Sequence, residues 1–191
     1  MLGKTEAGRF VRRGHFDYES GDHGDTWLAL ELLVGDPGRL ERAGARLAQA
    51  LRSHGAELVC GPLLGGALVG QWVARALGVR FVYAEHESRD LRGRRYAIPR
   101  ELRPAVVGKR AIVVDDAINA GSAVLACLRE IESLGGQGVA VASLIVREGA
   151  GKRMGKSLGI PVEALHRMRW RIWPPGDCPL CKSGVELTLA P

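Results

Sequence analysis

The sequence predicts an α/β protein with an open, twisted and mainly parallel sheet flanked by helices. The first observation is a set of short apolar runs, rich in β-branched residues and without polar alternation, which is typical of strands covered on both faces. The second is that segments with helical spacing of apolar residues lie between these runs. The third is glycine and proline punctuation, which predicts the order strand, helix, strand, strand, helix, strand.

The first half of the pattern is preceded by a helix that starts at Asp36. Aspartate is a favourable N-cap, proline follows it, and an apolar stripe continues until Leu51, before Gly55. A short strand then begins at 57 and leads through a Pro/Gly turn into an apolar helix that ends at about Leu77. The next strand is expected over 79–84.

The second half contains two more buried strands with a helix between them. The strands are expected over 112–114 and 139–146. The helix is expected over 122–134, where two consecutive glycines end it.

Two adjacent carboxylates, Asp115 and Asp116, follow the apolar run 111–114. Ligands of parallel sheets bind beyond the C-terminal strand ends, where carboxylates can accept hydrogen bonds from ribose hydroxyls or hold hydrated Mg²⁺. The turn that follows offers unobstructed backbone N–H groups and a helix N-terminus, which suit a 5′-phosphate. This turn consists of Ala117, Ile118, Asn119, Ala120, Gly121 and Ser122. The alternative is that the pair ends a strand and Ser122 caps a helix without any ligand.

A second candidate anion site is the turn before the first apolar helix. It consists of Leu63, Leu64, Gly65 and Gly66. Paired glycines let backbone amides approach an anion closely, although many such turns bind nothing.

Both turns resemble loops of a known family. Segment 111–123 resembles the ribose-phosphate loop of type I phosphoribosyltransferases, and 57–70 resembles the pyrophosphate loop of orotate phosphoribosyltransferases. The aromatic and Ser-Gly segment 14–25 and the Pro-Pro, Cys-x-x-Cys tail 173–185 resemble a bacterial, Thermus-type branch of the same enzymes. The resemblance covers nearly the whole chain.

The resemblance implies a single domain of the type I phosphoribosyltransferase fold. Its core would span about 36–165, with a small hood formed by about 1–35 and 166–191. The implied activity transfers ribose 5-phosphate from phosphoribosyl pyrophosphate to a nitrogenous base, most closely orotate, with Mg²⁺. A homodimer is implied as well.

The same resemblance assigns roles to residues. Asp115 and Asp116 would hold the ribose hydroxyls, and Mg²⁺ or its waters. The turn 117–122 would bind the 5′-phosphate, and the backbone of 63–66 the leaving pyrophosphate. Trp27 would supply an aromatic wall for the base.

The net charge of +6 suits either nucleic acid or a polyanionic small molecule. Six arginines crowd a glycine-containing segment between two strands: Arg89, Arg92, Arg94, Arg95, Arg100 and Arg103. In the family a mobile basic loop at this place closes over pyrophosphate, often across a dimer, so Arg94 and Arg95 are the candidate catalytic arginines. A solvated basic loop is the alternative. The placement of these arginines makes nucleic acid the less favoured partner, and direct regulation of DNA lacks an obvious reader because no helix-turn-helix segment precedes the core.

Two other patterns have simpler explanations. Arginines alternate with apolar residues over 167–173, which predicts an edge strand. Stacking of nucleic-acid bases on Trp170 is the less favoured interpretation. Segment 151–157 resembles a nucleoside-triphosphate loop but has alanine where the first glycine is required.

Cys178 and Cys181 have the spacing of zinc ligands. Cys60 and Cys127 fall in a predicted strand and helix and do not easily complete a set of four. A structural turn and a metal shared between subunits are both left open.

One departure from the family concerns the base. Orotate enzymes commonly place an arginine for the orotate carboxylate in the first helical turn after the phosphate loop, and Leu125 stands there. A purine or uracil phosphoribosyltransferase, or a non-catalytic regulator that binds phosphoribosyl pyrophosphate or a nucleotide, is therefore the alternative. The absence of a long apolar stretch argues against a membrane protein and predicts a cytoplasmic location.

Overall fold

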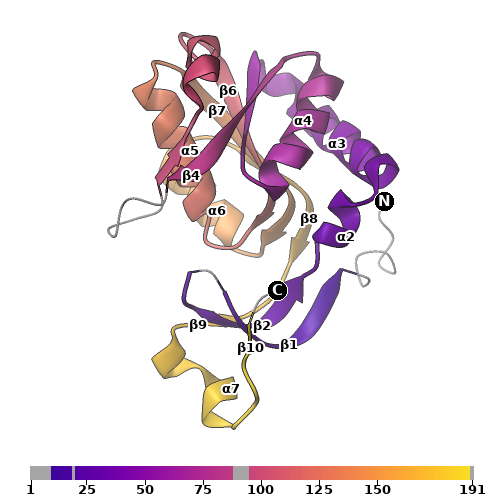
Figure 1. Ribbon diagram of the computed structural model, residues 1–191, viewed down its shortest axis with the longest axis vertical. Coiled ribbons are helices and arrows are strands. Elements are labelled where there is room, and N and C mark those ends of the chain that lie inside the picture. The colour runs from indigo at the N-terminus through magenta and orange to yellow at the C-terminus, as the bar shows by residue number, and fades with distance from the viewer. Residues whose placement is uncertain (1–9, 19, 88–94, 190–191) are drawn as a thin grey trace. The chain divides into compact units, whose positions relative to one another are not determined.

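The computed structural model describes residues 10–18, 20–87 and 95–189. The described chain forms two compact units (Figure 1). The larger unit runs from 36 to 168, and the smaller combines the N-terminal part up to 35 with the C-terminal part from 169. The division thus falls slightly later than the expected one at 165.

The larger unit is a six-stranded sheet with helices, in the order β5-β4-β3-β6-β7-β8. Its strands are β3 (Leu58–Pro62), β4 (Arg80–Glu87), β5 (Arg95–Ala97), β6 (Arg110–Ile118), β7 (Gln137–Arg147) and β8 (Val162–Met168). Its helices are α3 (Pro37–Leu51), α4 (Gly65–Leu77), α5 (Ser122–Ser133) and α6 (Ala150–Leu158), with 3-10 turns η1 (Arg52–His54) and η2 (Arg100–Ala105). Among the described strands of this sheet, only β4 and β5 pair antiparallel, so the predicted α/β class with a mainly parallel sheet is confirmed.

The expected elements form for the expected local reasons. The Asp36 carboxylate accepts a hydrogen bond from the backbone N–H of Arg39 at 3.0 Å and caps α3. Gly78 ends α4 with a φ of 72°, a left-handed conformation that glycine adopts without strain. Val113 of β6 pairs with Val141 of β7, and both are fully buried, as expected for central parallel strands.

The sheet is wound in two directions from its centre. The β3-α4-β4 crossover runs one way and β6-α5-β7 runs the other, because β3 and β6 are neighbours. Right-handed crossovers in opposite directions place α4 and α5 on opposite faces. Helix α3 packs beside α4, whereas α6 follows α5 and packs on β7 and β8 (Figure 1).

The smaller unit is a four-stranded sheet in the order β10-β1-β2-β9. Its strands are β1 (Val11–Asp17), β2 (His23–Leu28), β9 (Ile172–Trp173) and β10 (Thr188–Leu189). Short helical segments accompany them: α2 (Glu31–Val34), η3 (Pro175–Asp177) and α7 (Pro179–Lys182). The two C-terminal strands thus flank the paired N-terminal strands: β10 pairs with β1, and β9 pairs with β2.

The predicted edge strand over 167–173 is wrong. Arg167 and Met168 end β8, residues 169–171 lie in no strand, and β9 belongs to the other sheet. The alternation of arginines and apolar residues spans the end of β8 and the start of β9, which are close in the sequence but belong to different sheets. Alternation alone does not distinguish one continuous strand from two strand ends. Trp170 is buried, so it offers no stacking surface to nucleic acid.

The segment that resembles a nucleoside-triphosphate loop lies within α6. Gly151 is therefore helical, which supports discounting that resemblance. The sequence reasoning did not foresee α6, β5 or β8. No helix among the described residues has the length and hydrophobicity needed to cross a membrane.

Candidate active site

The two candidate anion loops leave neighbouring strands at the centre of the sheet. Val59 of β3 lies beside Ile112 of β6, and each strand leads from its C-terminal end into a helix, α4 or α5. The winding direction changes between these two strands. In open α/β sheets this switch point is where ligands bind.

Asp115 and Asp116 lie close to the C-terminal end of β6, as predicted. Asp115 is only 9% exposed, and its Oδ1 accepts a hydrogen bond from the backbone N–H of Asp116 at 2.9 Å. The Oδ1 of Asp116 accepts one from the backbone N–H of Ala117 at 2.7 Å. Each carboxylate is therefore oriented by the residue that follows it.

The proximity of the two carboxyl groups changes the acidity of Asp115. Burial, and after it the negative charge of Asp116, raises the pKa of Asp115 well above its usual range. Two ionised carboxylates at this position repel each other, so a cation or several hydroxyl donors would stabilise them.

The paired glycines lie directly against these carboxylates. A Cβ atom on Gly66 would lie 2.8 Å from the Oδ1 of Asp115, and a Cβ atom on Gly65 would overlap the carboxylate of Asp116. A side chain at Gly61 of β3 would in turn collide with the backbone of Gly66. Glycine is required here because two loops that are distant in the sequence meet without room for a side chain.

Both loops end in helix N-termini whose first amides have no partner within the helix. The first α-helical bond of α4 joins Leu68 N to Leu64 O at 3.2 Å, and that of α5 joins Leu125 N to Gly121 O at 2.9 Å. Three preceding N–H groups in each helix are thus left for other acceptors. Such amides, with the positive end of the helix dipole, bind anions.

The loop after β6 is shorter than predicted. Ala117 and Ile118 continue β6 and pair with β7, Asn119 to Gly121 form the turn, and Ser122 is the first residue of α5. Gly121, with a φ of 88°, occupies the N-cap position, so the interpretation of Ser122 as a cap is wrong. Hydrogen bonding of β6 to β7 prolongs the strand beyond its apolar run.

Two side chains of the loops have distinctive surroundings. The Oδ1 of Asn119 is buried and has no hydrogen-bond partner among the described residues. Leu63 and Leu64, which are joined by a cis peptide bond, are both exposed. The backbone of this turn is thus at the surface, whereas the glycines after it face the carboxylates.

Three predicted site residues are not brought into this arrangement by the described structure. Arg94 lies outside the described residues, and only the backbone of Arg95, at the start of β5, is described. Trp27 belongs to β2 of the smaller unit, where its ring stacks on Tyr18 with a centroid distance of 6.4 Å. The roles assigned to these three residues stay predictions.

Ser143 is a residue of the site region that sequence reasoning missed. Its fully buried hydroxyl, on β7, donates to the backbone oxygen of Asp116 at 2.9 Å and thereby supports the carboxylate pair from the neighbouring strand. A single hydroxyl inside the apolar run 139–146 was the available signal, since a buried hydroxyl needs a partner.

Comparisons with known proteins agree with this geometry. The family model described as "Phosphoribosyl transferase domain" matches residues 35–175. The chain is 31% identical to an orotate phosphoribosyltransferase of Caldanaerobacter subterraneus subsp. tengcongensis, over 93% of this chain and 88% of the relative. It is 35% identical to one from Carboxydothermus hydrogenoformans, over 91% and 87% of the two chains.

The fold is also similar to that of solved structures. An adenine phosphoribosyltransferase from Thermoanaerobacter pseudethanolicus matches with a TM-score of 0.70 and 23% identity, over 86% of this chain and 99% of the other. The family match spans the central sheet, both glycine and carboxylate loops and the helices that follow them. The chain therefore belongs to the phosphoribosyl transferase family.

Proposed function

We propose that this protein is an orotate phosphoribosyltransferase, which transfers ribose 5-phosphate from phosphoribosyl pyrophosphate to orotate and releases pyrophosphate. The observation that carries the proposal is the contact of Gly65 and Gly66 with Asp116 and Asp115 at the switch point of the sheet. The two similar proteins named above are orotate phosphoribosyltransferases, which supports this substrate.

The arrangement suggests how the sugar phosphate would be held. The first amides of α5 would bind the 5′-phosphate, and Asp115 and Asp116 would accept hydrogen bonds from the ribose hydroxyls. The first amides of α4 would bind the pyrophosphate. Holding the substrate at three points fixes the anomeric carbon for attack by the base, and the α4 amides stabilise the charge that develops on pyrophosphate as its bond breaks.

The donor set fits Mg²⁺. This cation prefers oxygen ligands and usually keeps several waters, so a carboxylate pair is a suitable site. Asp115 and Asp116 would hold it, directly or through its waters. Burial, and after it the charge of Asp116, raises the pKa of Asp115, and a bound cation would favour its ionised form. When bound, Mg²⁺ would neutralise charge on the pyrophosphate.

Two further parts of the proposal rest on the family resemblance. Arg94 and Arg95 would close over the pyrophosphate and neutralise it as it leaves. A homodimer would place this basic segment near the partner's site. Analytical ultracentrifugation tests the dimer, and a monomer with full activity would contradict it.

A purine or uracil base is the second candidate. Leu125 is half-buried in the first turn of α5 and has no charge to offer the orotate carboxylate. Losing a buried charge pair typically weakens binding by about 2 to 5 kcal/mol, so a neutral base would be preferred if no other cation replaces the arginine.

The deciding experiment measures pyrophosphate release from phosphoribosyl pyrophosphate and Mg²⁺ with orotate, uracil, adenine, guanine, hypoxanthine and xanthine. Orotate-dependent release is expected. Release with another base only would reassign the substrate. If folded protein releases no pyrophosphate with any base but still binds phosphoribosyl pyrophosphate in calorimetry, the result would favour the non-catalytic regulator.

A further inference from the structure

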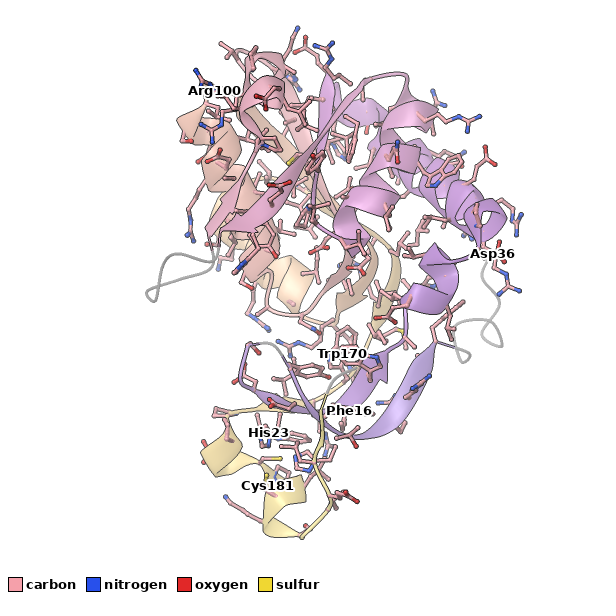
Figure 2. The ribbon with its side chains drawn as sticks, viewed as in Figure 1. Phe16, His23, Asp36, Arg100, Trp170 and Cys181 are labelled. Atoms are coloured by element: carbon pink, nitrogen blue, oxygen red, sulfur yellow. The ribbon has the colours of Figure 1, made fainter. Side chains whose placement is uncertain are left out.

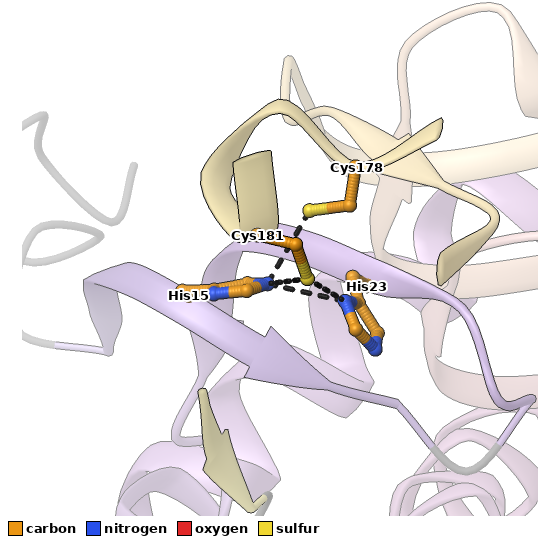
Figure 3. Close-up of side chains that lie close together, drawn as sticks. All are labelled: His15, His23, Cys178 and Cys181. Atoms are coloured by element: carbon orange, nitrogen blue, oxygen red, sulfur yellow. Dashed lines mark hydrogen bonds between the residues drawn. The ribbon is translucent and has the colours of Figure 1, made fainter. Parts of the chain in front are cut away.

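Four side chains from both ends of the chain converge in the smaller unit (Figure 3). His15 comes from β1, His23 from β2, Cys178 immediately precedes α7 and Cys181 lies within it. The four potential ligand atoms lie within 4.8 Å of one another. Figure 2 places His23 and Cys181 in the same region of the smaller unit.

The separations are those of atoms that share one tetrahedral ion. His15 Nε2 lies 3.1 Å from His23 Nδ1, 3.3 Å from Cys178 Sγ and 3.6 Å from Cys181 Sγ. His23 Nδ1 lies 3.2 Å from Cys181 Sγ. With the usual Zn–N and Zn–S bond lengths, tetrahedral ligands are separated by about 3.3 Å for two nitrogens and about 3.6 Å for nitrogen and sulfur.

Local structure orients each pair of ligands. Asp17 of β1 pairs with His23 of β2, and His15 lies two residues before Asp17, where β1 has a register shift. The side chains of His15 and His23 meet, with Nε2 and Nδ1 3.1 Å apart. The sequence Cys178-Pro-Leu-Cys181 closes through a hydrogen bond from Lys182 N to Cys178 O at 3.3 Å, which turns both sulfurs toward one side.

A backbone contact sets the tautomer of His15. Its Nδ1 lies 2.9 Å from the carbonyl oxygen of Val185, which can only accept a hydrogen bond. The proton therefore resides on Nδ1, and the lone pair of Nε2 points at the other three ligand atoms. Metal-bound histidines are typically fixed in this way by an acceptor on the second ring nitrogen.

Burial and charge favour a divalent ion. His15 is 2% exposed and Cys178 is fully buried, so unpaired charges there would be unfavourable. Two thiolates and two neutral imidazoles compensate the charge of Zn²⁺, and this ligand set is common in structural zinc sites. Cys60 and Cys127, in β3 and α5, take no part: contact with Cys60 and burial raise the pKa of Cys127, which keeps that thiol protonated.

We propose that His15, His23, Cys178 and Cys181 bind one zinc ion within a single chain. This assignment answers the question that the Cys-x-x-Cys spacing leaves open, because the two missing ligands are histidines of the N-terminal strands. All four positions are occupied by protein atoms, so the ion is structural rather than catalytic. It joins the N-terminal hairpin to the C-terminal segment across a sheet in which β9 and β10 are only two residues long.

The test uses the full chain without a polyhistidine tag, purified in reducing buffer and dialysed against metal-free buffer. Inductively coupled plasma mass spectrometry is expected to find about one zinc ion per chain. His23→Asn and Cys181→Ser should retain less than about a tenth of this zinc. Cys127→Ala is the matched control, because it removes a buried thiol outside the cluster, and it should retain all of the zinc.

Two measurements keep the test decisive if variants fold poorly. Titrating wild-type thiols with a mercurial should release zinc to a coloured chelator, and replacing zinc with Co²⁺ should give the visible bands of a tetrahedral thiolate site. Wild-type protein that contains no zinc and takes none up would overturn the proposal. Loss of zinc in Cys127→Ala but not in Cys181→Ser would also overturn it.

Discussion

Gly66 approaches Asp115 so closely that a Cβ atom would lie 2.8 Å from the carboxylate oxygen. This contact joins the loop after β3 to the end of β6, at the centre of the sheet. The position of the carboxylates therefore depends on a residue without a side chain in another loop.

Replacing Gly66 with alanine is expected to displace Asp115 and to lower kcat/KM by about 100-fold, since a shift of about 1 Å in a site has effects of this size. Steady-state kinetics with phosphoribosyl pyrophosphate measures the loss. Gly38→Ala in α3 is the matched control, because its Cβ would make ordinary contacts of 3.5 Å or more and should leave activity unchanged. Equal activity of both variants would contradict the importance of the contact.

Asp116→Asn should lower kcat/KM for phosphoribosyl pyrophosphate strongly and leave the fold intact. The amide can still accept the bond from Ala117 N, but it loses the charge that would bind ribose hydroxyls or Mg²⁺. Losing hydrogen bonds to a charged group corresponds to about 1.5 to 3 kcal/mol, or roughly 10- to 150-fold. Circular dichroism checks the fold, and an unchanged rate would remove the proposed role.

The raised pKa of Asp115 predicts a pH-dependent stability. The folded state holds the proton of Asp115 more tightly than the unfolded state does. The free energy of unfolding of the wild-type protein without ligands should therefore fall as the pH rises from about 4, the usual carboxyl pKa, to the raised pKa of Asp115. Asp115→Asn cannot ionise, so it should melt at a higher temperature than wild type at neutral pH, with the difference vanishing in acid. Thermal melts across pH test this, and a difference independent of pH would contradict it.

Leu125→Arg should increase the ratio of kcat/KM for orotate to that for uracil by about tenfold, because a charged donor would then face the orotate carboxylate. The two rates are measured on the same preparation. Leu125→Met is the control, since it keeps the size and the lack of charge. If the ratio is the same for both variants, Leu125 does not lie at the base.

Much of the central sheet could be predicted because its signals are local. Asp36 and Pro37 mark the start of α3, and the apolar run 139–146 marks most of β7. The extension of β6 to Ile118 could not be predicted, because it depends on hydrogen bonding to β7 rather than on residue type. Strands β5 and β8 were missed because charged side chains interrupt their apolar patterns.

The candidate site was predictable in its parts but not in its contacts. The carboxylates and the glycines each have a recognisable local pattern, whereas the collision that a side chain on Gly65 would cause is visible only in three dimensions. The zinc ligands illustrate the same limit. Cys178 and Cys181 carry a recognisable spacing, but His15 lies 163 residues from Cys178 in the sequence.

The pairing of β1 with β10 and of β2 with β9 has a consequence for synthesis on the ribosome. The larger unit is one continuous stretch, 36–168, and its strands can pair as they emerge. Strands β1 and β2 can pair with each other before the larger unit is made, but β9 and β10 join them only after that unit is complete, and β10 only after residue 189 has left the exit tunnel. The sheet of the smaller unit is thus completed after that of the larger unit, although two of its strands are made before it.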